Sequence, residues 1–298
     1  RGLSKYTAPG LVSWEALQGA GAISAAVTAL AADLTRDQHR TKVMAMIGSS
    51  IGLVFALSMV AAPLLYAAIG MAGIFWLTAI LAFGAIGVLL WVVPAAPPVP
   101  RATGRLIDVL RDGQLMRLNF GVFALHLIQT TMWVMVPSAL VASGGLPMPE
   151  HWKVYLPAVL GSLLIMGGLL FRLERMGYFK QVYLGSIALI VLAQLGFWLN
   201  LHAPSLWAVG ALLCVYFIGF NTQEASQPSL VSRLAEPRQR GAALGVYNTL
   251  MSLGIFAGGS LGGLVIKSWG STGIFFVSAG LMLLWMALAW PMRATKRA

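Results

Sequence analysis

Glu224 is an ionisable side chain deep within a long apolar stretch of this 298-residue chain. It follows Asn221 by three residues, so both side chains share one face of a helix, and Pro228 disturbs the backbone hydrogen bonding of that helix nearby. A carboxyl group in apolar surroundings is costly unless it faces a cavity or a partner. We therefore interpret Glu224 as a group that takes up and releases a proton. The alternative is a structural glutamate, hydrogen-bonded beside the proline.

His126 begins a stripe of polar and aromatic side chains on one face of another apolar stretch. Gln129, Thr130, Trp133 and Pro137 continue the stripe at helical spacing. At 1.5 Å per residue, His126 lies about 12 Å into its stretch. This face suits a water-filled cavity better than lipid, and a histidine there can accept a proton near neutral pH. The alternative is an interhelical hydrogen bond made by His126.

The composition requires helices that cross a membrane to carry these residues. Hydrophobic residues make up 58% of the chain and charged residues 10%, whereas about a quarter of a soluble domain is charged. The apolar runs are continuous rather than alternating, which predicts helices and excludes barrel strands. Nine segments have the required length of about 20 residues. They are roughly 10–33, 43–69, 73–94, 118–142, 154–171, 181–200, 205–230, 241–266 and 272–292.

The net charge of +11 is spread unevenly over the connecting loops. Most of the 20 Lys and Arg lie in alternate loops, which the positive-inside rule makes cytoplasmic. This distribution predicts an outside N-terminus and a cytoplasmic C-terminus, and it favours a lipid bilayer over nucleic acid as partner. The single cysteine, Cys214, excludes an intramolecular disulfide. The spacing of polar residues indicates no metal site, no cofactor site and no enzymatic nucleophile.

A repeat with an offset of 200 residues relates the two ends of the chain. Nine residues recur without a gap: Arg40, Leu53, Leu64, Gly70, Gly73, Ile74, Phe75, Ala79 and Leu81 match Arg240, Leu253, Leu264, Gly270, Gly273, Ile274, Phe275, Ala279 and Leu281. Such a repeat in a membrane chain predicts a transporter built from two similar halves. Segments one to three then match segments seven to nine, so we expect three further helices before residue 1. The expected domains are residues 1–94 from the first half, a proline-rich cytoplasmic loop at 95–117 with a short amphipathic helix at 105–112, and the second half at 118–298.

Several motifs resemble the major facilitator superfamily, and more narrowly its YajR-like branch, grouped with proton-driven drug efflux proteins. They are Gln18-Gly19-Ala20-Gly21, Asp33-Leu34-Thr35-Arg36 with Arg40, Phe75-Trp76, Trp91 to Pro94, Leu125-His126, Glu150 to Leu156 and Phe220 to Leu230. The resemblance implies an all-α major facilitator fold of which this chain holds helices 4–12 of twelve. It also places His126 on a helix that lines the central cavity.

The resemblance assigns further roles near the first segment. Gln18 lies close to a site that is usually basic in the family and linked to proton movement, although Glu15 stands where the arginine is expected. Asp33, Arg36 and Arg40 would form a charge latch between helices, with Arg240 as the repeat counterpart of Arg40. The alternative for these charges is plain anchoring at the membrane surface. Ser58-Met59 replaces the Gly-Pro of the family's antiporter motif.

The resulting expectation is a secondary active transporter for small organic or lipophilic compounds, coupled to protons and working by alternating access. His126, Gln129, Trp133, Asn221, Glu224 and Gln18 are its candidate substrate and proton pathway. No Lys or Arg lies deep within a segment, which favours export of neutral or cationic compounds. The alternatives are an uptake carrier of the same fold for a polar metabolite, and a truncated fragment without function. We expect a monomeric, multi-pass protein of the bacterial inner membrane.

Overall fold

The computed structural model describes residues 27, 30–31, 34–93, 106–170, 172–173, 176–236 and 238–292. All regular secondary structure in these ranges is helical. The elements are η1 (Asp37–His39), α3 (Arg40–Trp91), α4 (Leu106–Arg111), α5 (Gly113–Gly144), η2 (Met148–Glu150), α6 (Trp152–Ile165), the π-helical turn η3 (Met166–Leu170), α8 (Phe179–Asn200), α9 (Leu206–Leu234) and α10 (Arg240–Ala289). The first expected segment, with Glu15, Gln18 and Asp33, lies almost wholly outside the described residues.

Five of the described helices are long and apolar enough to cross a membrane: Val60–Trp91 of α3, α5, α8, α9 and α10. The expected segment at 154–171 is α6 with η3, which continue each other as one helical run. The expected short helix at 105–112 forms as α4, and its Val109 is fully buried. The all-helical membrane fold predicted from the sequence is therefore confirmed.

The long helices α3 and α10 are each two expected segments joined at a glycine. Gly70 has φ 65° and ψ −177°, and Gly270, exactly one repeat later, has φ 66° and ψ −169°. This backbone conformation is essentially restricted to glycine. The repeat predicted from the sequence is thus also a repeat of backbone shape, with a sharp bend at the same position in each copy.

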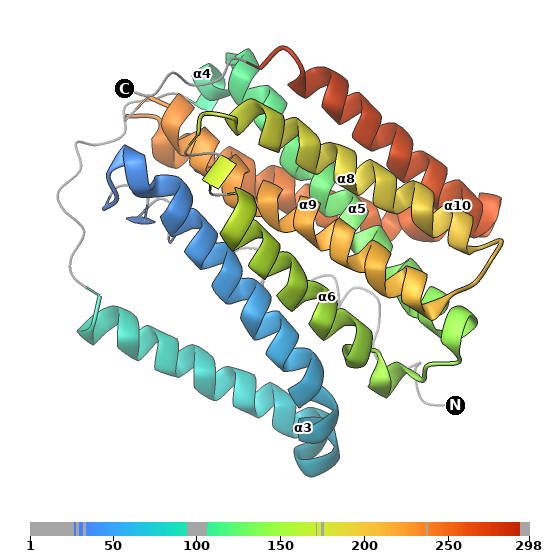
Figure 1. The fold of residues 1–298 in the computed structure, drawn as a ribbon. Coiled ribbons are helices and arrows are strands. Elements are labelled where there is room, and N and C mark those ends of the chain that lie inside the picture. The colour runs from blue at the N-terminus through green and yellow to red at the C-terminus, as the bar shows by residue number, and fades with distance from the viewer. Residues whose placement is uncertain are drawn as a thin grey trace.

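The bundle is built around α5. It packs against α10 and α9, while α8 packs against α9 and α10, and α6 packs against α9. The first arm of α3 lies along α6 and α9, and its second arm, which ends at Trp91, extends away from the bundle (Figure 1). The core between α5, α8, α9 and α10 contains the largest fully buried side chains, including Trp285, Tyr216 and Phe197.

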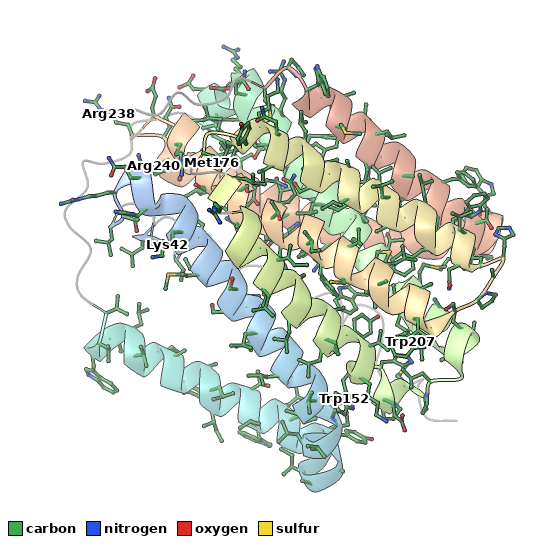
Figure 2. The ribbon with its side chains drawn as sticks, in the orientation of Figure 1. Lys42, Trp152, Met176, Trp207, Arg238 and Arg240 are labelled. Carbon is green, nitrogen blue, oxygen red and sulfur yellow. The ribbon has the colours of Figure 1, made fainter. Side chains whose placement is uncertain are left out.

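The two ends of the bundle differ in their side chains. Lys42, Arg238 and Arg240 lie at one end, which we call the basic end, and Trp152 and Trp207 lie toward the opposite end (Figure 2). Helices α3, α5, α8 and α10 begin at the basic end, and α9 and α10 finish there (Figure 1). This arrangement agrees with the alternation of basic loops seen in the sequence.

A substitution at the bend of α10 should separate backbone strain from packing. Gly270→Ala should lower the free energy of unfolding by about 1–3 kcal/mol, because alanine does not tolerate this conformation. No described atom lies within 4 Å of the added Cβ, so a steric clash would not explain the loss. Gly263→Ala is the matched control, since Gly263 is helical and equally open. It should be neutral or stabilising by up to about 1 kcal/mol. Thermal unfolding in detergent measures the stability of both variants. Equal shifts in melting temperature would show that backbone strain at position 270 does not cause the loss.

Candidate functional site

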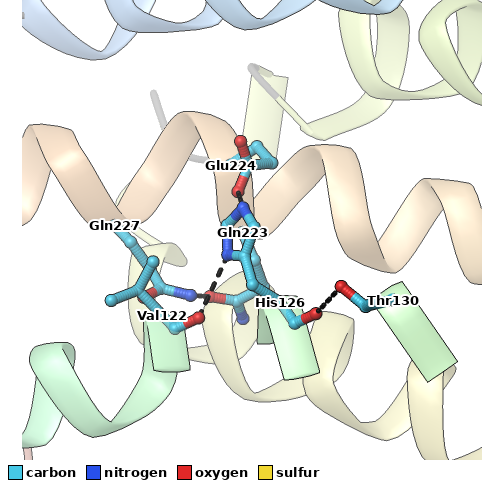
Figure 3. A network of polar contacts seen from close by, with 6 residues as sticks. All are labelled: Val122, His126, Thr130, Gln223, Glu224 and Gln227. Carbon is cyan, nitrogen blue, oxygen red and sulfur yellow. Dashed lines mark hydrogen bonds and ion pairs between the residues drawn. The ribbon is translucent and has the colours of Figure 1, made fainter. Parts of the chain in front are cut away.

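His126 of α5 and Glu224 of α9 meet in the middle of the bundle (Figure 3). The His126 Nε2 atom lies 3.4 Å from the Glu224 Oε1 atom. The side chain of His126 is 7% exposed and that of Glu224 is 28% exposed. The structure thus joins the two proton-binding candidates that the sequence offered separately, and leaves part of the Glu224 side chain accessible.

The hydrogen bond on the other side of the His126 ring fixes the position of its protons. Nδ1 lies 3.0 Å from the carbonyl oxygen of Val122, one turn earlier in α5. A carbonyl oxygen only accepts, so we assign the hydrogen to Nδ1. In a neutral histidine Nε2 is then an acceptor, and it faces the oxygen of Glu224. The contact is attractive only if one more proton is present, on Nε2 or on the carboxyl group.

The spacing of the pair fits a loose ion pair better than a fully formed hydrogen bond. Charge-assisted N–H···O bonds are about 2.7–2.9 Å long, whereas this contact measures 3.4 Å. Glu224 Oε1 correspondingly has no hydrogen bond with good geometry among the described residues. A pair held this loosely can open with little loss of bonding.

Packing around the histidine holds its ring in place. The Thr130 hydroxyl donates to the His126 carbonyl at 3.0 Å, within α5. Phe220 of α9 meets the imidazole edge-on, with ring centroids 6.0 Å apart, and stacks on Tyr216 at 5.9 Å. The ring is thus enclosed by aromatic groups on the α9 side, which lowers the local dielectric and strengthens its interaction with Glu224.

Asn221 shares a helix face with Glu224 but has a different partner. Its Nδ2 donates to the Ser162 hydroxyl of α6 at 2.9 Å, and Ser162 donates to the carbonyl of Val159 at 2.7 Å. Asn221 therefore ties α9 to α6, while Glu224 faces α5. Helix α9 runs unbroken through Pro228 to Leu234, so the proline does not end the helix.

Gln129 and Trp133 line a small crevice between α5, α6 and α9, together with Tyr155 and Tyr216. Trp133 lies against Tyr155 with ring centroids 5.4 Å apart. The crevice measures about 10 Å³, which is room for roughly one water molecule. The other members of the stripe beside His126 are half-buried, so this face of α5 is partly accessible: Gln129, Thr130, Trp133 and Pro137.

The adjoining face of α9, which packs on α8, carries a polar network that sequence reasoning missed. Gln223 Nε2 donates to the Tyr183 carbonyl at 2.8 Å and to the Ser186 hydroxyl at 2.7 Å, both in α8. Gln227 Nε2 donates to Gln223 Oε1 at 3.3 Å. The sequence did contain a signal for this network, because one glutamine precedes Glu224 and another follows it within an apolar segment.

The structure does not test the expected charge latch, because only some of its residues are described. The Arg240 Nε atom donates to the Ser232 carbonyl at 3.0 Å, so it binds the last turn of α9. Arg36 is exposed. Asp33, Gln18 and the side chain of Arg40 lie outside the described residues. Within the part of the chain that the structure describes, no cluster of three or more His, Cys, Asp or Glu could hold a metal ion.

Comparisons with known proteins identify the family. The model of the Major Facilitator Superfamily matches residues 6–259, and a second match covers residues 173–298. The inner membrane transport protein YajR of Escherichia coli (strain K12) is 38% identical over 290 residues. The alignment covers 95% of this chain and 63% of that relative, so the chain spans less than two thirds of its length.

A more distant relative and a solved structure are also similar to this chain. The multidrug resistance protein MdtH of Yersinia enterocolitica is 24% identical over 191 residues, 63% of this chain and 45% of that protein. The crystal structure of the human organic anion transporter MFSD10 (TETRAN) superposes with a TM-score of 0.74, at 23% identity, over 89% of this chain and 67% of that one. This last match supports the fold alone. The chain is a multi-pass membrane protein that belongs to the Major Facilitator Superfamily, a family of transporters and not of enzymes.

Proposed function

We propose that this chain is part of a secondary active transporter that exports small organic or lipophilic compounds in exchange for protons, by alternating access. The observation that carries the proposal is the His126–Glu224 contact of 3.4 Å, with Nδ1 of the histidine held by Val122. This arrangement needs one bound proton to be attractive. Loss of that proton turns the contact into a repulsion between two acceptors, which gives a proton a direct effect on how α5 and α9 pack.

The exposed part of Glu224 suggests how a solute enters the cycle. When the pair opens, the carboxylate is free to attract a cationic or hydrogen-bonding solute in place of the proton. The lysines and arginines among the described residues lie toward helix ends rather than beside the pair, which disfavours anionic solutes. Phe220 beside the pair and Trp133 on the same face of α5 are aromatic, which favours lipophilic solutes. One relative is named a multidrug resistance protein, which is consistent with this class.

The wider organisation follows the same proposal. The helices correspond to the last nine of a twelve-helix transporter, with residues 1–94 in the first half, 95–117 in a cytoplasmic loop and 118–298 in the second half. We place the basic end of the bundle, and the C-terminus, in the cytoplasm by the positive-inside rule. The relative from Escherichia coli is named an inner membrane protein, and we propose the same membrane and a monomeric state for this protein.

Transport by the full-length protein in liposomes tests the proposal directly. With an imposed pH gradient, the lipophilic cation ethidium should move against its concentration gradient, and collapse of the gradient with a protonophore should stop it. An anionic probe such as fluorescein should not move. Gradient-driven movement of the anion alone would contradict the proposal and favour the uptake carrier. If neither probe moves, these compounds are not its substrates and export of lipophilic cations is excluded.

A further inference from the structure

Two buried tyrosines line the crevice between α5, α6 and α9, and the proposed transport cycle has not used them. Tyr155 of α6 and Tyr216 of α9 are each 2% exposed. Neither hydroxyl group has a hydrogen-bond partner among the described residues. Such groups are rare in native proteins, because a buried hydroxyl loses its hydrogen bonds to water without replacement. The two tyrosines therefore mark the crevice as a place where a polar group of a ligand binds.

The crevice lies beside the His126–Glu224 pair, on the side away from the basic end. On α5, Gln129 and Trp133 follow His126 by three and seven residues, which is about 5 and 10 Å along the helix. On α9, Tyr216 precedes Glu224 by eight residues, or about 12 Å. The two helices run in opposite directions, and both counts lead to the same side of the pair (Figure 1). One elongated solute can therefore reach from Glu224 to the crevice.

Aromatic side chains connect the crevice with the pair. Trp133 lies against Tyr155, with ring centroids 5.4 Å apart. Tyr216 stacks on Phe220 at 5.9 Å, and Phe220 meets the His126 ring edge-on at 6.0 Å. This aromatic surface suits the lipophilic body of a solute, but it does not select a polar group. Selection of a polar group requires hydrogen-bonding groups such as the two hydroxyls.

The size and chemistry of the crevice define the group that fits. Its volume of about 10 Å³ has room for a single water-sized group, such as an ether or carbonyl oxygen. A phenol hydroxyl donates one hydrogen bond, and a carbonyl oxygen has two lone pairs to accept from two such donors. None of the described residues that line the crevice is charged, so the group that binds there is neutral. The side-chain shifts that commonly accompany binding bring its oxygen within reach of the hydroxyls.

We propose that Tyr155 and Tyr216 are specificity-determining residues that donate hydrogen bonds to a neutral oxygen atom of the solute. The preferred solutes are lipophilic cations with an uncharged acceptor about 10–12 Å from the positive charge. The inference rests on the proposed function, because it places the cationic group of the solute at Glu224. It extends that function by naming the second group that is recognised and the residues that recognise it.

A pair of isosteric probes tests the role of the hydroxyls. One probe is trimethyl(ω-methoxyoctyl)ammonium, and the other is decyltrimethylammonium, in which a methylene group replaces the ether oxygen. Equilibrium binding of each radiolabelled probe is measured on the full-length protein in lipid nanodiscs. Tyr155→Phe and Tyr216→Phe should each weaken binding of the ether about 2- to 10-fold, the loss expected for one hydrogen bond. Binding of decyltrimethylammonium should be unchanged, because it has no oxygen to accept the bond.

Melting temperatures and a control variant separate recognition from a structural role. Tyr155→Phe and Tyr216→Phe should melt at or above the wild-type temperature, because each removes a buried hydroxyl that has no partner in the fold. Tyr178→Phe is the control, since Tyr178 is exposed at the basic end and its loss should affect neither probe. A lower melting temperature with equal loss of both probes would show that the hydroxyls support the fold and would overturn the inference.

The remaining outcomes distinguish this inference from the proposed function. Glu224→Gln should weaken both probes, because both carry the cationic group. Wild-type affinity of both probes in Glu224→Gln, or no saturable binding of either probe to the wild-type protein, would overturn the solute site at Glu224 and this inference with it. Binding that depends on Glu224 but is the same for the ether in wild type, Tyr155→Phe and Tyr216→Phe would overturn the role of the tyrosines alone.

Discussion

Glu224→Gln should abolish proton-driven solute movement while the protein remains folded. Glutamine has the shape of glutamate, and its amide can donate to His126 Nε2, which accepts in the neutral histidine. The contact between α5 and α9 is therefore kept, but the side chain can no longer bind or release a proton. We expect transport driven by a pH gradient in liposomes to fall below detection. Exchange of labelled for unlabelled solute without a gradient, which moves no net proton, should persist in part.

Glu150→Gln is the matched control for this variant. Glu150 is an exposed carboxylate at the opposite end of the bundle, paired with Lys153 at 2.6 Å. Exposed ion pairs contribute about 1 kcal/mol or less, so transport and stability should both stay close to wild type. Unchanged pH-driven transport in Glu224→Gln would show that the proton is carried elsewhere, and the role of the pair would have to be abandoned.

Gly258→Ala should destabilise the bundle next to the His126–Glu224 pair. A Cβ at Gly258 would meet the Leu127 carbonyl oxygen of α5 and would lie 2.9 Å from the Thr130 Cβ, and Gly254 packs in the same way on the backbone of Phe123. Rigid backbone cannot move aside as a flexible side chain can. Overpacking of this kind costs about 1–3 kcal/mol. It also pushes on the turn of α5 that holds His126.

The neighbouring glycine offers a close comparison. At Gly259 the added Cβ would have its nearest contact at 3.9 Å, an ordinary van der Waals distance. Gly259→Ala should therefore be neutral or slightly stabilising, because alanine favours the helix by about 1 kcal/mol over glycine. Thermal unfolding in detergent and the yield of monodisperse protein measure both. Equal melting temperatures for the two variants would mean that α10 does not lie so close to α5.

The helices and their bends follow from local properties of the sequence. Apolar runs of sufficient length predict membrane helices whatever their neighbours are, and the repeated Gly70 and Gly270 mark the bends because few other residues adopt that backbone. The helix boundaries shifted by a few residues, as for α5, which begins at Gly113 rather than near residue 118. There Asp112 caps the helix through its side chain, a contribution that hydropathy does not register.

The contact between His126 and Glu224 could not be predicted from the sequence alone. Depth and chemistry marked His126 and Glu224 separately, but they lie on different helices, and their meeting depends on the packing and rotation of α5 against α9.

In the proposed transport cycle, the bond between His126 Nδ1 and Val122 has a consequence for the direction of transport. A histidine that carries protons from one side of a membrane to the other by rotating its ring must release both nitrogens in turn. Here Nδ1 is hydrogen-bonded to the backbone of its own helix, so the ring does not rotate and only Nε2 exchanges protons. A ring in one fixed orientation cannot by itself release a proton to one side of the membrane after taking it from the other. Vectorial movement must come from the helices, which decide the side to which the same nitrogen and the same carboxyl group are open at each moment.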